Sequence, residues 1–283
     1  MILDDMDSRP GSATSLLRTI VGTCLREVGG WIAAPHLLAL MGTVGVSAPR
    51  TRTALNRVRP KGLLEPETRD GTSGYRLVPQ AVPMLERGDR RIYTPRRMAE
   101  SDRWCLVSYS VPEENRGLRH QLRRRLHWIG CGSVATGLRV CPEYLAEEVR
   151  EILDDLGLAG NSLLFLADEV RGPGTPAERV ATWWDLDAIG DLHEAFLSAH
   201  GDRIRALGDR PEPRQAFATW IASLDTWRII PYLDPGLPPS LLPADWPGNE
   251  SIPLFLDLQK SVLPQAAAYV REVTGGGRPV VPR

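Results

Sequence analysis

A short basic segment, Ser47–Lys61, constrains the fold of this chain more than any other segment does. It contains five cations and no acidic residue, although the whole chain has a net charge of only −1. Ser47 is suited to cap a helix, and Pro49 is tolerated in a first helical turn. Helical spacing gives such a helix two different sides. The largely apolar side consists of Thr51, Ala54, Leu55 and Val58, and the polar side consists of Arg52, Thr53, Asn56 and Arg57. A helix with one apolar and one Arg/Asn/Thr side suits the DNA major groove; the alternative is a solvated surface helix.

The segments before this helix match a helix-turn-helix. Two helices with apolar stripes are expected over 15–28 and 35–42. The residues 45–47 are suited to the tight turn that joins the second helix to the basic one. The residues 1–13 are acidic and polar, and we expect them to form a disordered arm.

The segments after the basic helix predict a β-hairpin, the wing of a winged helix. Gly62 is expected to end the helix. Strands are expected at 63–65 and 74–78, joined by a loop over 68–74 that is rich in turn-forming residues. Together these elements predict a winged-helix DNA-binding domain over 14–79.

The predicted domain suggests which side chains contact DNA. Arginine binds guanine and asparagine binds adenine through paired hydrogen bonds, so Arg52, Asn56 and Arg57 are the expected base-contacting residues. Arg50 and Thr53 flank them. Cations near the end of the helix and on the wing are expected to hold phosphates, and these are Arg59, Lys61, Arg69 and Arg76.

A second domain is predicted over 102–170. Apolar spacing gives strands and helices in the order β-α-β-β-α-β, which is that of a ferredoxin-like unit with two helices on one face of a four-stranded antiparallel sheet. A basic connector is expected over 80–101, with a short helix broken by Pro83. The fold class is therefore α+β with several domains.

The third predicted domain, over 176–273, is mainly α-helical. Helices are expected over 178–199, 214–230 and 252–273, and residues 274–283 are expected to be disordered. Five of the eight tryptophans lie in this domain. Large aromatic side chains favour a role in the core or a dimer interface, and a pocket for an aromatic or acyl ligand is the alternative.

Composition narrows the class of protein. A near-neutral net charge argues against a protein that coats nucleic acid without specificity. No apolar run approaches the length of a membrane span, and the N-terminus lacks the apolar core of a signal peptide, so a cytoplasmic protein is expected. The four cysteines show no metal-ligand spacing and are expected to be buried reduced thiols; no cofactor or metal is expected.

Several longer stretches are specific enough to indicate a family. They are Ser15–Gly22 (SLLRTIVG), Arg26–Ile32 (REVGGWI), Arg52–Leu55 (RTAL), Gly74–Leu77 (GYRL), Gly88–Tyr93 (GDRRIY), Trp104–Glu114 (ending SVPEE), Trp184–Asp187 (WDLD) and Leu233–Gly248 (ending LLPADWPG). These stretches span nearly the whole chain and resemble the PaaX family of bacterial regulators, the phenylacetate-pathway repressors. The resemblance implies a winged helix, a central domain similar to the CRISPR protein Cas2, and a helical C-terminal domain.

The resemblance also implies a function. It implies a homodimer that binds double-stranded operator DNA, represses a catabolic operon, and releases the DNA on binding an aryl-CoA thioester such as phenylacetyl-CoA. The chain departs from the family pattern at Thr51, Pro60, Pro83 and the segment Asp225–Arg228. A paralogue that senses another acyl-CoA or another aromatic compound is therefore an open alternative.

An effector site is expected between the central and C-terminal domains. Candidate contacts for CoA phosphates are Arg116, Arg119 and Arg123, and candidate contacts for the acyl group are Trp183 and Trp184. For the arginines, a solvated helix face is the alternative.

The chain is not expected to be an enzyme. A Cas2-like metal-dependent nuclease needs a carboxylate near the end of the first strand of the central domain, where this chain has Ser108–Val111. Glu113 and Glu114 follow that strand, but they suit the N-terminus of the next helix. A thioesterase or acyltransferase needs a nucleophile beside a base, and the sequence has no GxSxG or Cys–His signature.

Overall fold

The computed structural model describes residues 8–208 and 210–275, and the chain divides into two units. The first unit contains the chain up to Tyr93, Ala195–Arg228 and the residues from Glu250 onward; the second contains Thr94–Glu194 and Ile229–Asn249. The sequence predicts three consecutive domains instead, and the helical domain predicted over 176–273 is shared between the two units. The reason is that one C-terminal helix packs against the first helix of the winged-helix part.

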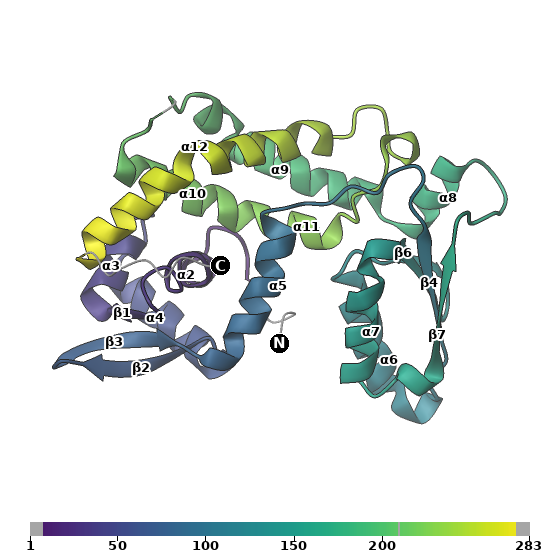
Figure 1. Cartoon of the computed structure of the whole chain (residues 1–283), viewed down its shortest axis with the longest axis horizontal. Coiled ribbons are helices and arrows are strands. Elements are labelled where there is room, and N and C mark those ends of the chain that lie inside the picture. The colour runs from purple at the N-terminus through teal and green to yellow at the C-terminus, as the bar shows by residue number, and fades with distance from the viewer. Residues whose placement is uncertain (1–7, 209, 276–283) are drawn as a thin grey trace. The chain divides into compact units, whose positions relative to one another are not determined.

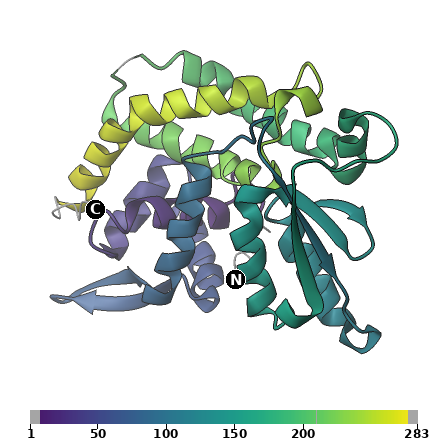
Figure 2. The ribbon, with the colours of Figure 1, turned by 45° about the vertical axis from the view of Figure 1, so that its right-hand side comes forward.

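The predicted winged helix-turn-helix is present in the first unit. Its helices are α2 (Ala13–Cys24), α3 (Ala34–Thr43) and α4 (Ala48–Val58). Its three-stranded sheet has the order β1-β3-β2, with β1 (Trp31–Ala33), β2 (Leu64–Arg69) and β3 (Thr72–Leu77). The hairpin β2–β3 extends beyond the helices (Figure 2). The short strand β1 is not predicted from the sequence, because three residues give no alternation to detect.

The turn of the wing is tighter than predicted. The sequence predicts a loop over 68–74, but β2 and β3 pair as far as Arg69 and Thr72. Only Asp70 and Gly71 form the turn, with φ of 48° and 77°. Positive φ at both central residues matches the right-handed twist of the strands, and Asp-Gly is a favoured pair for such a turn.

The connector begins with a helix that belongs to the first unit. Helix α5 (Val82–Ile92) has Pro83 in its first turn, so the prediction that this proline breaks the helix is wrong. The first turn needs no backbone N–H donor, and proline is therefore tolerated there. Asp89 of α5 forms an ion pair with Arg26 at 2.6 Å.

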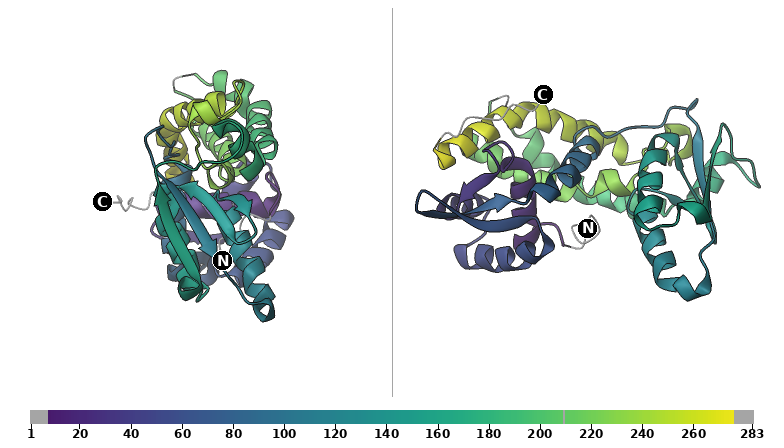
Figure 3. Two further views of the ribbon diagram at one scale, coloured as in Figure 1. Left: turned by 90° about the vertical axis from the view of Figure 1, so that its right-hand side faces the viewer. Right: turned by 60° about the horizontal axis from the view of Figure 1, so that its bottom comes forward.

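The second unit contains the predicted ferredoxin-like fold. Its elements are β4 (Trp104–Tyr109), α6 (Arg116–His127), β5 (Gly132–Ala135), β6 (Leu138–Pro142), α7 (Ala146–Asp155) and β7 (Ser162–Ala167). The antiparallel sheet has the order β5-β6-β4-β7. Helices α6 and α7 lie on one side of the sheet and α8 (Pro176–Trp183) on the other (Figures 1 and 3).

The two faces of this sheet have separate cores. Along β4, Cys105 and Val107 point toward α6 and α7 and are fully buried. Trp104 points to the opposite face, where it packs with Trp184 and Trp246. The alternation of a strand separates these two groups of side chains.

The C-terminal helices differ from the prediction in one respect. The single helix predicted over 178–199 is two helices, α8 and α9 (Leu186–Arg205), because Trp184 is extended, with φ −119° and ψ 146°. The remaining helices are α10 (Pro213–Trp227), the short α11 (Ile230–Leu233) and α12 (Gly248–Thr274). In the described residues, no helix is long and apolar enough to cross a membrane.

Aromatic side chains fill the core of the first unit. Trp227 of α10 stacks on Phe255 of α12 at 4.3 Å between ring centroids. Phe196 of α9 meets Trp227 edge-on at 5.2 Å, and Tyr93 stacks on Trp220 at 6.1 Å. The core interpretation is therefore confirmed for Trp220 and Trp227, which are almost fully buried. The prediction of buried, unpaired cysteines is also confirmed.

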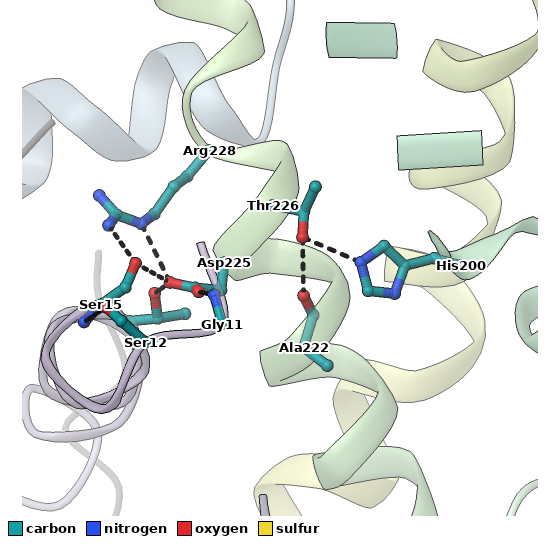
Figure 4. A network of polar contacts seen from close by, with 9 residues as sticks. Gly11, Ser12, Ser15, His200, Ala222, Asp225, Thr226 and Arg228 are labelled. Carbon is teal, nitrogen blue, oxygen red and sulfur yellow. Dashed lines mark hydrogen bonds and ion pairs between the residues drawn. The ribbon is translucent and has the colours of Figure 1, made fainter. Parts of the chain in front are cut away.

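A buried carboxylate joins α10 to α2 (Figure 4). Asp225 Oδ1 accepts hydrogen bonds from Ser15 Oγ at 2.6 Å and Thr19 Oγ1 at 2.7 Å. Its Oδ2 accepts one from the backbone N–H of Gly11 at 2.7 Å. Arg228 Nη2 donates to Ser15 Oγ at 2.9 Å and completes the network. These bonds link the winged-helix part and the C-terminal helices into one unit.

A second contact of α10 lies beside this network (Figure 4). Nε2 of His200 and Oγ1 of Thr226 share a hydrogen bond of 2.9 Å. Burial, and to a smaller extent the charge of Arg203, lowers the pKa of His200. The ring is therefore neutral at pH 7, and the contact ties α9 to α10 without adding a buried charge.

The two predicted disordered ends need correction. Within the predicted arm, residues 8–12 are ordered: Ser12 caps α2 by accepting a hydrogen bond from the backbone N–H of Ser15, and its own N–H donates to the carbonyl of Arg9. At the other end, Thr274 is the last residue of α12. The rest of both segments, 1–7 and 276–283, lies outside the described residues.

Candidate nucleic-acid interface

Helix α4 presents its polar side to solvent as predicted. Thr51, Ala54, Leu55 and Val58 are buried, and α4 packs against α2 and α3. Every residue predicted to contact bases or flank them on this helix is exposed, namely Arg50, Arg52, Thr53, Asn56 and Arg57. The 3-10 turn Arg59–Lys61 follows, and Gly62 ends it with φ 73°. Pro60 has no backbone N–H donor, which explains why the α-helix stops at Val58.

Two polar residues of α4 have local partners. Ser47 occupies the N-cap position, but its side chain accepts no capping hydrogen bond. The carbonyl of Ser47 instead accepts two hydrogen bonds from Thr51, one from the backbone N–H at 2.9 Å and one from the side-chain hydroxyl at 3.1 Å. The hydroxyl of Thr53 donates to the carbonyl of Pro49 at 3.1 Å. The exposed Thr53 side chain can therefore offer its methyl group and an acceptor to a base edge.

A groove of about 800 Å³ runs between α4 and the N-terminal part of α2. We call it the basic groove. Among the described residues, its walls contain five cations and no carboxylate. These lining residues are Ser8, Arg9, Ser12, Ala13, Thr14, Arg18, Pro49, Arg50, Thr53, Ala54, Asn56, Arg57, Pro60 and Lys61. A concave site lined by one sign of charge concentrates ligands of the opposite sign.

The basic groove includes some of the predicted DNA-contacting residues, excludes others, and contains two arginines that were not predicted. Arg50, Asn56 and Arg57 are among its walls, whereas Arg52 and Arg59 are not. Arg9 and Arg18 are the residues that sequence reasoning missed. Arg18 is only 6 % exposed. The sequence does contain a hint, because the charged Arg18 directly follows the apolar pair Leu16–Leu17 in a helix that is otherwise largely buried. No spacing rule, however, shows that α2 lies next to α4.

The wing arginines already have anionic partners. Arg69 pairs with Glu67 at 2.5 Å, and its guanidinium lies 5.3 Å from the ring centroid of Trp31. Arg76 pairs with Glu65 and, at 3.0 Å, with Glu67. With Asp70, the hairpin carries three acids and two arginines, a net charge of −1. Phosphate contacts by Arg69 and Arg76 stay a prediction, and these ion pairs count against it.

Family models match three consecutive parts of the chain. Residues 12–81 match the PaaX-like protein model, residues 97–180 the PaaX protein central Cas2-like domain, and residues 184–272 the PaaX-like protein C-terminal domain. The chain belongs to the PaaX family of transcriptional regulators. The first match covers the helix-turn-helix and the wing, and the second covers the ferredoxin-like fold.

Two individual relatives agree with the PaaX assignment. The transcriptional repressor PaaX of Escherichia coli is 28% identical over 268 residues, which cover 93% of this chain and 84% of that protein. A solved structure, the uncharacterized protein Rv0674 from Mycobacterium tuberculosis, is 24% identical with a TM-score of 0.56 and covers 93% of this chain and 99% of that one. The second similarity supports the fold alone.

The effector site predicted from the resemblance is not assembled in the second unit. Arg116, Arg119 and Arg123 lie on α6, on one side of the sheet, whereas Trp183 and Trp184 pack against Trp104 on the other. The four-stranded sheet lies between the two groups (Figure 1), so this unit does not bring them together, and an effector site that includes them stays a prediction.

Arg119 and Trp184 each form hydrogen bonds with other residues of the second unit. Arg119 donates to the carbonyl of Val111 at 2.9 Å and to Glu113 at 2.8 Å. The indole N–H of Trp184 donates to the carbonyl of Gly130 at 2.8 Å, and this side chain is 7 % exposed. Both residues hold the fold of the second unit together.

The region around strand β4 does not support the alternative of a metal-dependent nuclease. Strand β4, WCLVSY, has no carboxylate. Glu113, the first carboxylate after it, is paired with Arg119 and begins the turn before α6. Among the described residues, no group of three or more His, Cys, Asp or Glu side chains could hold a metal ion.

Proposed function

We propose that this protein is a repressor that binds operator DNA as a homodimer and represses an aromatic-acid catabolic operon of the phenylacetate type. The observation that carries the proposal is the exposed Arg/Asn/Thr side of α4, next to a groove in which every charged side chain among the described lining residues is positive. Membership of a family of transcriptional repressors supports it. In this proposal α4 enters the major groove, as the second helix of a helix-turn-helix does.

A dimer places two copies of α4 on one face of the DNA. The half-sites of a pseudo-palindromic operator are then one or two helical turns apart, at ~34 Å per turn. Within each half-site, Arg52, Asn56 and Arg57 contact base edges, while Arg59 and Lys61 contact phosphates.

An aryl-CoA thioester, such as phenylacetyl-CoA, is proposed to release the DNA. Such an effector must bind the released state more tightly than the DNA-bound state, because equal affinity for both would shift nothing. A tenfold weaker affinity for DNA requires ~1.4 kcal/mol of coupling. The proposal assigns no pocket to the effector, since the predicted residues lie on opposite faces of the sheet.

The test is a fluorescence-anisotropy titration on DNA upstream of the protein's own gene and its neighbours. We expect tight binding to one of these regions and much weaker binding to a scrambled sequence. Phenylacetyl-CoA should reverse the binding and free CoA should not. Specific binding that ignores the thioester would favour a paralogue with another effector. If no upstream region is bound at low salt, the repressor proposal fails.

The edge strand β7 is the proposed contact between the two copies. Leu163, Phe165 and Leu166 are the large hydrophobic side chains exposed in the described residues, at 64%, 51% and 43%. The strand SLLFLA contains no charge, whereas Asp168 follows it. Antiparallel pairing of two copies puts the two Asp168 side chains at opposite ends, and it satisfies the unpaired backbone edge of each strand. A second copy of the chain therefore fits this edge.

Phe165→Glu should convert the dimer to a monomer at micromolar concentration, because it places a charge in the apolar contact. Sedimentation velocity measures the change. Ala135→Glu, at an exposed position of the opposite edge strand β5, is the control and should stay dimeric. A dimeric Phe165→Glu protein would contradict the choice of β7, and a monomeric wild type would contradict the dimer itself.

A further inference from the structure

We infer that the basic groove holds the sugar-phosphate backbone of one DNA strand, with Arg9 and Arg18 as phosphate contacts outside the basic helix α4 and the wing. The inference rests on the proposed function, and it adds a binding surface that the basic helix and the wing alone do not supply. Its ligand class is the phosphodiester chain.

The charge of the groove points to an anion. Arg9 and Arg18 come from the start of the chain and from α2, while Arg50, Arg57 and Lys61 come from α4 and the turn after it. Five cations and no acid are among the described residues that line this concave surface, in a chain whose net charge is −1. A concave surface lined by charges of one sign attracts ligands of the opposite sign, such as a phosphate chain.

The burial of Arg18 shows that the site is built rather than a loose surface patch. Arginine is seldom so deeply buried, yet Arg18 is 6 % exposed and forms part of the wall. The groove has about 800 Å³, within the range of specific ligand sites. An arginine guanidinium can bind two phosphate oxygens at once.

The N-terminus of α2 adds to the same field. Ser12, Ala13 and Thr14, the cap and the first turn of this helix, line the groove. The first N–H groups of a helix and the positive end of its dipole favour an anion at that position. The wall is also held in place, because the N–H of Gly11 and the hydroxyl of Ser15 are bound to the buried Asp225.

The position of the groove fits a DNA strand beside α4. Thr53, Asn56 and Arg57 form both the exposed side of α4 and one wall of the groove. When the helix reads base edges with these residues, the adjacent strand lies along the same flank. The wing has a net negative charge and its arginines are paired with glutamates. The phosphate contacts that a wing often supplies are therefore expected from the groove.

The salt dependence of DNA binding tests the inference. Each phosphate contact contributes about 0.9 to the slope of log K against log salt concentration. We expect Arg9→Ala and Arg18→Gln each to reduce the slope by about 0.9. Operator and scrambled DNA should lose affinity by the same factor, since phosphates carry no sequence information. Arg214→Ala, an exposed arginine of α10 outside the groove, is the control and should leave the slope unchanged.

The outcomes separate this inference from the proposed function. If wild type binds the operator but neither Arg9→Ala nor Arg9→Glu changes the slope, the groove does not hold the backbone and the repressor proposal survives. Arg9 is exposed, so these two variants keep the test valid if Arg18→Gln fails to fold. If wild type binds no DNA, both ideas fail.

A CoA nucleotide is a second source of phosphate groups. Free CoA should leave DNA binding unchanged when the groove belongs to the DNA backbone. If free CoA displaces DNA from wild type but not from the Arg9→Ala protein, the groove belongs to a nucleotide and the inference is overturned.

Discussion

Replacing Asp225 with alanine should lower the free energy of unfolding by about 3–5 kcal/mol. The carboxylate is fully buried, and it accepts hydrogen bonds from Gly11, Ser15 and Thr19. Its removal leaves those donors unsatisfied and leaves the buried Arg228 without its counter-charge at 3.5 Å. Urea unfolding measures the loss, and the melting temperature should fall by about 6–20 °C for a unit of this size.

A matched control and a milder variant make this result specific. Asp257→Ala removes an exposed aspartate of α12 that pairs with Lys260 at 3.4 Å, and it should change stability by less than about 0.5 kcal/mol. Asp225→Asn keeps one accepting oxygen but turns the other position into a donor, so its loss should be intermediate. A change of under about 1 kcal/mol in Asp225→Ala would show that water or rearranged side chains satisfy the network.

The coupling between Asp225 and α2 can be measured as well. Ser15→Ala should destabilise the wild type, because Asp225 and Arg228 both bind its hydroxyl. In the Asp225→Ala background the same change should cost much less, since the main partner is gone. Additive losses would mean that the serine acts by packing rather than through the carboxylate.

The elements that depend on local pattern are the ones the sequence predicts well. The buried side of α4 follows from the spacing of Ala54, Leu55 and Val58, and the ferredoxin-like order follows from alternating strands and amphipathic helices. Where local rules compete, the prediction is less accurate. The sequence predicts that Pro83 breaks a helix, whereas it lies in the first turn of α5, and it predicts a longer loop where Asp70 and Gly71 form a two-residue turn.

Contacts between distant segments are not visible in a pattern. Asp225 is separated by more than 200 positions from Ser15, and no pattern in either segment indicates that the two residues form a hydrogen bond. The joining of the C-terminal helices to the winged helix therefore appears only in the structure. The same limit applies to the effector-site prediction, because the sequence does not show that the sheet lies between Arg119 and Trp184.

The candidate DNA surface contains residues that a local pattern predicts and residues that only a contact between distant segments brings together. Helical periodicity suffices to expose Asn56 and Arg57, because it depends only on residues of α4 itself. The groove on the flank of α4 needs the position of α2, so Arg9 and Arg18 were not found. The ion pairs of the wing were also not predicted, because the cross-strand partners Glu65 and Arg76 can be recognised only once the register is known.

Replacing Arg57 with alanine should weaken operator binding by ~1–3 kcal/mol, or about 5- to 150-fold. In the proposed complex this exposed guanidinium binds one guanine through two hydrogen bonds, and no other side chain replaces both. Specificity at that base should relax, so the ratio of operator to scrambled-DNA affinity falls as well. Titrations on the operator and on single-base variants measure both quantities.

Two matched variants separate base reading from charge. Arg57→Lys keeps the charge but loses the planar fork, so the affinity for scrambled DNA should stay near wild type while specificity falls. Arg59→Ala removes a cation that follows α4 and should weaken all sequences equally. Unchanged operator affinity in Arg57→Ala would show that α4 does not read bases through this residue. A uniform loss in Arg57→Ala, matching that of Arg59→Ala, would instead make Arg57 a phosphate contact, because only a base contact can discriminate between sequences.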